Sequence, residues 1–182
     1  MVSENYSIVA YIPGKLGEFV DSLRRRLNPN FAAWLAHVTL LPPRALLTPP
    51  EELLVPIRQR CRSVEPFVVS LGRVHTFWPA NGVVYLSVSA GGARLAELHE
   101  ALNCDHLACN ENYPYVPHVT VAQELDEAGT HAALQAISSA WSDFPNSQSF
   151  RIESLVLVRQ MDGSRWIDLA TIPLGDSESH SR

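Results

Sequence analysis

The pattern His-x-Thr-x occurs twice in this chain, as residues 37–40 (HVTL) and residues 118–121 (HVTV). Each copy lies in a short apolar run rich in β-branched residues, which predicts a buried strand. On a strand, residues i and i+2 project to the same face about 6.6 Å apart. Each copy therefore places an imidazole and a hydroxyl side by side, while the valine and the fourth residue point into the core.

Apolar runs that alternate with turn residues predict seven strands. They cover residues 5–12, 33–41, 66–77, 83–90, 117–124, 150–159 and 165–172. We expect the second strand to stop at Pro42-Pro43, because proline can neither donate to a strand ladder nor enter a helix interior. Asn81-Gly82 and the Met161-Asp162-Gly163 turn predict two hairpins, each joining two consecutive strands.

Apolar residues at helical spacing predict four helices. They cover about 16–27, a segment that ends near residue 61, about 92–103 and about 127–142. The first helix carries Arg24 to Arg26 near its C-terminal end, where the helix dipole favours cations. The second begins either at Thr48-Pro49, with a hydroxyl cap and a proline in the first turn, or only at Pro56. His99 and His131 fall on predicted helices, and we expect both at the surface.

The order of these elements repeats. Each half supplies a strand with the His-x-Thr-x pattern, then a helix, then a hairpin, which indicates a duplication. We expect an α+β fold of two similar lobes related by a pseudo-twofold axis, with antiparallel or mixed sheets facing a central cleft and helices outside. Residues 1–175 would form this single domain, with its two lobes interleaved and one motif in each. Residues 176–182 would form a disordered polar tail.

The charge of the chain argues against one class of function. With 14 basic and 19 acidic residues in 182, the net charge is −5, which disfavours a broad nucleic-acid-binding face.

No apolar run reaches the roughly 18 residues of a membrane span, and the N-terminus lacks the pattern of a signal peptide. The three cysteines are an odd number and are interpreted as reduced thiols. We therefore expect a cytoplasmic monomer that does not bind membranes.

Two such strands facing one another would bring two imidazoles and two hydroxyls to a space the size of a phosphate. A neutral histidine could take a proton from an attacking water while a protonated one donates to the leaving oxygen, and the hydroxyls would bind the non-bridging oxygens. Histidine suits both roles because its pKa lies near neutrality. This chemistry needs neither metal nor cofactor. The spacing of Cys104, His106 and Cys109 is not that of a zinc site either.

Other interpretations stay open. A single strand histidine is more often a hydrogen-bonded structural residue than a catalytic one. Two copies at corresponding places of a repeat favour chemistry. The alternatives to an enzyme are a nucleotide-binding or phosphate-binding module of the same fold, and an interaction domain in which the matching strands reflect duplication alone.

Together with Pro117 before the second motif, the paired motifs resemble those of the 2H phosphoesterase superfamily, also called the 2′-5′ RNA ligase-like or cyclic phosphodiesterase family. The resemblance extends over most of residues 5–173. It implies a bilobal α+β fold and a metal-independent activity on 2′,3′-cyclic phosphates or 2′-5′ linkages. By position it makes His37 the general acid and His118 the general base, with Thr39 and Thr120 binding the phosphate.

The chain departs from that family's pattern at one place. Many RNA-directed members have a basic residue soon after the second motif, where this chain has Ala122-Gln123-Glu124. We therefore expect a small cyclic nucleotide or an RNA end as substrate rather than a long RNA. Gln123 is a candidate hydrogen-bond donor to the substrate. Arg44 is either a compensating cation or a surface residue.

Aromatic residues near the motifs are candidates to stack on a base. They are Phe31, Trp34, Phe77, Trp78, Tyr113 and Tyr115. Trp78 at a turn, and Tyr113 and Tyr115 in the polar loop before the second motif, are the strongest candidates. For each one the alternative is a place in the core, where most large aromatic side chains lie.

Overall fold

The computed structural model describes residues 5–31, 33–46, 48–161 and 165–176. The strands in these ranges are β1 (Asn5–Tyr11), β2 (His37–Ala45), β3 (Phe67–Thr76), β4 (Val84–Ala90), β5 (His118–Ala122), β6 (Ser149–Ile152), β7 (Ser154–Gln160) and β8 (Trp166–Pro173). The α-helices in the same ranges are α1 (Gly14–Leu27), α2 (Pro50–Arg62), α3 (Gly92–Leu102) and α4 (Glu127–Ser142). Two single-turn 3₁₀ helices cover Pro29–Phe31 and Asp105–Leu107. No helix in the described part of the chain is both long and apolar enough to cross a bilayer.

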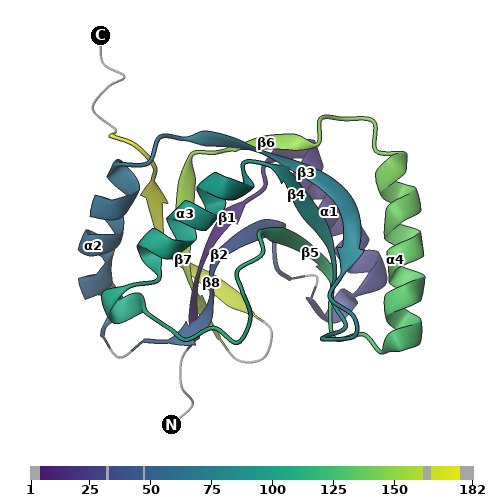
Figure 1. Ribbon diagram of the computed structural model, residues 1–182, viewed down its shortest axis with the longest axis horizontal. Coiled ribbons are helices and arrows are strands. Elements are labelled where there is room, and N and C mark those ends of the chain that lie inside the picture. The colour runs from purple at the N-terminus through teal and green to yellow at the C-terminus, as the bar shows by residue number, and fades with distance from the viewer. Residues whose placement is uncertain (1–4, 32, 47, 162–164, 177–182) are drawn as a thin grey trace.

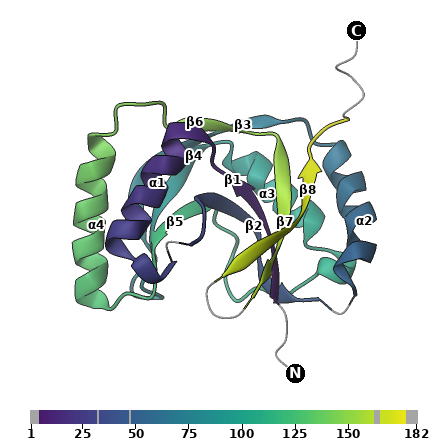
Figure 2. The same ribbon diagram turned by 180° about the vertical axis from the view of Figure 1, so that it is seen from behind.

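The strands form two four-stranded antiparallel sheets, in the orders β2-β1-β7-β8 and β5-β4-β3-β6. Helices α1 and α4 pack on the second sheet, and α2 and α3 pack beside the first (Figures 1 and 2). This confirms the expected α+β fold with helices on the outside. β2 and β5, the strands that carry the two motifs, are both edge strands, and they lie next to each other where the sheets meet.

The two halves of the chain exchange their hairpins. The β3–β4 hairpin follows β2 in the chain but pairs with β5, where Leu86 lies opposite Val119. The β7–β8 hairpin follows β5 but joins the other sheet through β1, where Leu157 lies opposite Ile8. Neither half can therefore form its sheet without strands from the other half.

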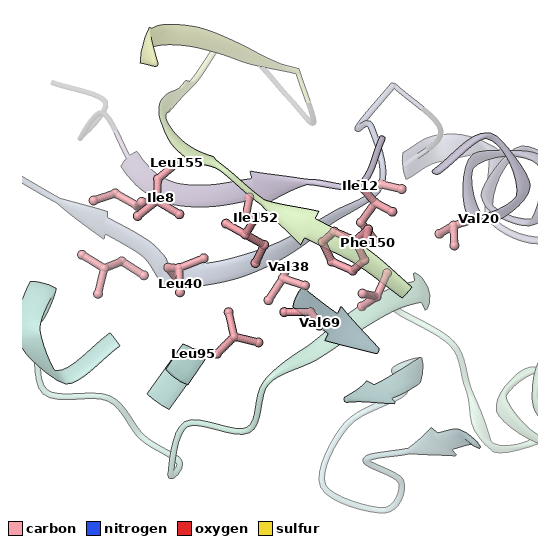
Figure 3. Close-up of a cluster of buried hydrophobic side chains, with 14 of the residues drawn as sticks. Ile8, Ile12, Val20, Val38, Leu40, Val69, Leu95, Phe150, Ile152 and Leu155 are labelled. Carbon is pink, nitrogen blue, oxygen red and sulfur yellow. The ribbon is translucent and has the colours of Figure 1, made fainter. Parts of the chain in front are cut away.

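One continuous hydrophobic core holds the motif strands in place. Val38 and Leu40 of β2 are buried, as are Val119 and Val121 of β5, so the expected alternation along both motifs is confirmed. Figure 3 shows side chains of β1, β2, β3 and α3 meeting in this core. Burying an aliphatic side chain of this size contributes about 1.5–3 kcal/mol. The buried residues of each motif thus fix the direction in which its histidine and threonine point.

The predicted bounds of the second strand are wrong. β2 begins at His37 rather than at residue 33, and it continues through Pro42 and Pro43 to Ala45. β2 is an edge strand, where a missing backbone N–H is tolerated. Its pairing with β1 is irregular around the two prolines, because the register shifts between the Tyr6–Arg44 and Ile8–Leu41 pairs. Such a bulge accommodates prolines that a regular ladder would exclude.

The segment predicted as one strand over 150–159 is divided between the two sheets. β6 pairs with β3 and β7 pairs with β1, with Glu153 between them. Helix α2 runs without interruption from Pro50 to Arg62 and includes Pro56, so the start at Pro56 is wrong. The expected hydroxyl cap is wrong as well, because the N-cap residue is Pro49 and no side chain caps this end of the helix. The final hairpin is confirmed, although residues 162–164 of its predicted turn lie outside the described ranges. Residues 177–182 of the predicted tail lie outside them as well.

Candidate active site

A cavity of about 800 Å³ lies where β2 and β5 meet. It is lined by His37 and Thr39 of β2 and by His118 and Thr120 of β5. The polar segment 109–116, which leads into β5, forms another wall. This volume falls within the range of small-molecule sites, about 300–1,000 Å³. The structure therefore brings together the four residues that the two motifs singled out.

The two histidines are held in the same way. His37 Nδ1–H donates to the carbonyl oxygen of Leu35, and His118 Nδ1–H donates to that of Val116, each at 2.6 Å. A carbonyl oxygen only accepts, so this bond assigns the proton to Nδ1 in each ring. Nε2 is left as the nitrogen that can exchange a proton with a bound molecule. Each ring accepts at Nε2 when neutral and donates there when protonated.

Burial lowers the pKa of both imidazoles. At His37 the guanidinium of Arg24 lowers the pKa further, and His118 acts in the same direction. Both rings are therefore neutral in the free protein near neutral pH. A phosphate anion beside them would favour protonation of one ring, because an opposite charge stabilises the protonated form.

The carbonyl groups of both motif threonines are capped by side chains. Tyr115 donates its hydroxyl to the Thr39 carbonyl at 2.9 Å. Arg24 donates Nε and Nη2 to the Thr120 carbonyl at 2.9 and 2.6 Å. Edge strands leave such carbonyls unpaired, and the caps satisfy them. Among the described residues no side chain or backbone group engages either threonine hydroxyl, so both can bind an anion.

Aromatic rings border both imidazoles. The ring centroid of His118 lies 5.1 Å from those of Phe77 and Tyr85, and Phe77 and Tyr85 stack on each other at 4.2 Å. His37 lies 6.3 Å from Trp34. These rings exclude water from one side of each histidine, which agrees with the direction of their pKa shifts.

Comparison with known proteins places this architecture in a family. A sequence model of the 2′-5′ RNA ligase superfamily matches residues 12–164, which is most of the chain. The chain belongs to this superfamily. A protein of Bacillus cytotoxicus is 30% identical over 172 residues, covering 92% of this chain and 95% of its own length. One of Bacillus pumilus is 28% identical over 172 residues, covering 94% and 98%. Both bear the name "Putative phosphoesterase", and together with the superfamily they support an enzyme of the phosphoesterase type.

Solved structures show the same fold at low sequence identity. E. coli LigT complexed with NADP+ superposes with a TM-score of 0.66 at 18% identity, covering 96% of this chain and 99% of that one. The protein TT0787 of Thermus thermophilus gives a TM-score of 0.62 at 19% identity, covering 96% and 100%. E. coli LigT has also been crystallised with 3′-AMP, with phosphate and with ATP.

The aromatic candidates of this superfamily member differ in their positions. Those that line the cavity are Trp34, Phe77, Tyr113 and Tyr115. Tyr113 is 64% exposed, so its ring is accessible to a base. Trp78 is half-buried and does not line the cavity, although it is next to Phe77. The side chain of Phe31 lies outside the described part of the chain.

Arg44 lines the cavity, but its guanidinium is bound to the protein. It donates to the carbonyls of Pro42 and Leu107, to Asn103 Oδ1 and, at 2.7 Å, to the carboxylate of Glu111. The residue is 6% exposed, so the surface alternative is wrong. Its charge is balanced by Glu111, and its contacts tie the loop after α3 to β2.

The expectation that His99 lies at the surface is wrong as well. Helix α3 packs against β2, and His99 Nδ1–H donates to the Leu40 carbonyl at 2.7 Å. The ring stacks on Tyr115 with centroids 4.0 Å apart, and Nε2 lies 3.5 Å from Glu111. Tyr115 is therefore engaged on one face by His99 and at its hydroxyl by Thr39. These contacts of Tyr115 stabilise the backbone of the first motif.

Two further lining residues follow the ends of α1 and β5. Gln123 comes directly after β5, and its backbone N–H donates to Asn28 Oδ1 at 3.2 Å. Asn28 is the residue after α1, and it lines the cavity too. The Gln123 side chain therefore stays a candidate donor to a bound molecule.

Sequence reasoning missed Arg24, which was interpreted only as a charge near a helix end. Arg24 is 4% exposed and lines the cavity. A signal was present, since Arg24 lies four residues after Val20 and three before Leu27, on the apolar face of the helix. A charged residue on such a face has to find polar partners inside the protein.

A smaller cavity of about 200 Å³ adjoins the first and shares His37 and Thr39 with it. Tyr11, Trp166 and Asp168 belong to its walls, and the Tyr11 hydroxyl donates to Asp168 at 2.6 Å. Within the described ranges no group of three or more His, Cys, Asp or Glu side chains is arranged to hold a metal ion.

Proposed function

We propose that this protein hydrolyses 2′,3′-cyclic phosphodiesters by general acid–base catalysis with His37 and His118. One observation carries the proposal. Two imidazoles that are anchored identically through Nδ1 border one cavity, and each lies two residues from a threonine that borders the same cavity. A site that only holds phosphate needs donors, but it has no need of two groups that can exchange protons. Among the phosphoesters that superfamily members act on, a cyclic diester needs one protonation and one deprotonation, which the two rings supply.

In the proposed reaction each of the four motif residues has one role. The hydroxyls of Thr39 and Thr120 donate to the non-bridging oxygens of the phosphate. By the family resemblance, His118 takes a proton from water as its oxygen forms a bond to phosphorus. His37 donates a proton to the ribose oxygen as that oxygen leaves. The products are a phosphomonoester and a free ribose hydroxyl.

Binding of the substrate anion produces the protonation states of the two histidines that the reaction needs. Both rings are neutral in the free protein because burial lowers the pKa of each. The negative phosphodiester raises the pKa of the nearby rings when it binds, so one ring takes up a proton. Substrate binding thus produces the pair of one neutral and one protonated imidazole.

The cavity fits a small cyclic nucleotide or an RNA end. Its cationic lining residues are Arg24 and Arg44, both buried, so the described part of the site offers no track of exposed cations for a long polyanion. The exposed ring of Tyr113 is a platform for one base. The nucleotide complexes of the similarly folded E. coli LigT are in keeping with a ligand of this size. A 2′-5′ linkage presents the same chemical groups and is a further candidate substrate.

The test is turnover of the four nucleoside 2′,3′-cyclic monophosphates in the presence of EDTA. We expect hydrolysis of at least one of them, and none by the double variant His37→Ala/His118→Ala. His131→Ala, which removes an exposed histidine of α4, serves as the matched control and should retain full turnover. A folded wild-type protein that binds phosphate but turns over none of the four would instead support the non-catalytic binding module.

A further inference from the structure

Two arginines line the main cavity, and their charges are balanced differently. Arg44 is paired with the carboxylate of Glu111 at 2.7 Å. Arg24 has one carboxylate within 4.0 Å among the described residues, that of Asp21, and the separation is the full 4.0 Å. The hydrogen bonds of Arg24 go to neutral carbonyl oxygens. Arg24 therefore brings the less compensated positive charge to the cavity.

The guanidinium of Arg24 connects β5 to the segment just before β2. It donates twice to the carbonyl of Thr120, at 2.9 and 2.6 Å, and once through Nη1 to the carbonyl of Trp34 at 2.9 Å. Thr120 lies in β5 of one sheet, and Trp34 lies just before β2 of the other. A planar guanidinium with several fixed donors suits this bridging role, which a lysine could not reproduce.

Keeping such a charge buried is unfavourable unless something offsets it. Arg24 is 4% exposed, and burial lowers its pKa to about 10, so it stays charged at neutral pH. Carbonyl oxygens satisfy its donors but do not balance its charge. An anion in the adjoining cavity would do so. The sequence has no basic residue directly after the second motif, and Arg24 approaches that motif from α1 instead.

We propose that Arg24 is the positioning residue of this site, which fixes Thr120 against the phosphate and supplies the positive charge that attracts it. The identity of the substrate rests on the proposed function. The binding of a phosphate anion beside Arg24 does not depend on that function. The charge of Arg24 also acts electrostatically on the His37 imidazole, as does His118 of β5. On its other side, Tyr11 of β1 contacts His37 and donates its hydroxyl to Asp168 of β8. Burial is the larger cause of the lowered pKa of His37, and the charge of Arg24 lowers it further until an anion offsets that charge.

The test uses four variants and inorganic phosphate as the probe. Arg24→Gln removes the charge, and Arg24→Lys keeps the charge but breaks the bridge. Asp21→Asn removes the acidic group beside Arg24, and Arg25→Gln removes the exposed neighbouring arginine as the matched control. Phosphate affinity is measured by calorimetry. The His37 imidazole is titrated by NMR and assigned by comparison with His37→Ala.

We expect Arg24→Gln to bind phosphate about tenfold more weakly. The pKa of His37 should be higher in this variant than in the wild type. Asp21→Asn should shift both quantities the opposite way, and Arg25→Gln should leave both unchanged. Arg24→Lys should keep the His37 titration near that of the wild type while lowering kcat more than it changes KM, because Thr120 loses its support. If Arg24→Gln does not fold, Asp21→Asn still tests the proposal, because it should bind phosphate more tightly and lower the pKa of His37.

Unchanged phosphate affinity and unchanged His37 titration in Arg24→Gln would overturn the proposal, as would an equal effect of Arg25→Gln. Neither measurement requires turnover. A wild-type protein that hydrolyses no cyclic nucleotide, but in which the Arg24 variants show these shifts, would overturn the proposed function and leave Arg24 as the anion-positioning residue.

Discussion

In the proposed mechanism the hydroxyls of Thr39 and Thr120 bind the non-bridging oxygens of the phosphate. Replacing either by valine keeps the shape of the side chain and removes one donor. We expect Thr39→Val and Thr120→Val each to lower kcat/KM by about 100-fold, the usual effect of losing one donor to a developing oxyanion. Steady-state kinetics on the best cyclic nucleotide measure this. Thr171→Val, at an exposed position of β8, is the control. An unchanged kcat/KM in both motif variants would exclude this role.

The two histidines also make stability depend on pH. Their pKa values are lower in the folded protein than in the unfolded chain, so the unfolded chain binds more protons as the solution is acidified. The free energy of unfolding should be highest above about pH 6.5, the pKa of an unperturbed histidine, and fall between about pH 7 and 5. Urea unfolding at several pH values measures this. A double variant, His37→Gln/His118→Gln, should lose most of the slope in that interval. A wild-type slope that persists in this variant would contradict the assignment.

Single residues differ in how far the sequence defines their place. His37 and His118 could be found from the repeated pattern, because the two-residue period of a strand puts histidine and threonine on one face whatever surrounds it. Arg24 and Arg44 could not, because their burial depends on carbonyls and carboxylates brought close by distant segments. Thr120 lies 96 positions from Arg24, and Glu111 lies 67 from Arg44.

At the scale of elements, the ion pair of Arg44 and Glu111 fastens the cavity-lining loop to β2. Both side chains are largely buried, at 4% and 17% exposure. Removing one partner leaves the other charge uncompensated, and we expect Arg44→Ala to lower the free energy of unfolding by about 3 kcal/mol. The matched control is Arg94→Ala, which removes an exposed pair with Glu97 and should change stability by less than about 0.5 kcal/mol. Equal effects in chemical denaturation would show that the loop is not held by this pair.

Elements whose signal is local were predicted more accurately than elements whose place depends on distant strands. Helix α4 was predicted with its observed bounds, because an apolar stripe at helical spacing is a local property of the sequence. The structure adds an N-cap that was not predicted, since the Asp126 side chain accepts from the backbone N–H of Gly129. β2 was misplaced because its prolines are compatible with an edge strand alone, and edge position is set by the whole sheet. The division at Glu153 was missed for the same reason, since the partner strand and not the local pattern assigns β6 and β7 to different sheets.

At the scale of the whole molecule, the exchanged hairpins make the two sheets depend on each other. The hydrophobic core runs through both sheets without a break. We therefore expect one cooperative unfolding transition, with coincident curves from tryptophan fluorescence and from far-UV circular dichroism. The tryptophans report on both sides, since Trp166 lies in the first sheet and Trp141 contacts the second through Gly72. Two separate transitions would show that the sheets fold independently.

In the proposed mechanism two histidines, brought together from strands far apart in the sequence, act as one catalytic unit. The most direct measurement compares kcat for a 2′,3′-cyclic nucleotide in the wild type, in His37→Ala, in His118→Ala and in the double variant. We predict that each single variant loses at least about 100-fold, and that the double variant is no worse than the more impaired single one, because groups acting as a unit are not additive. Losses that multiply in the double variant, or a single variant with wild-type kcat, would contradict the account.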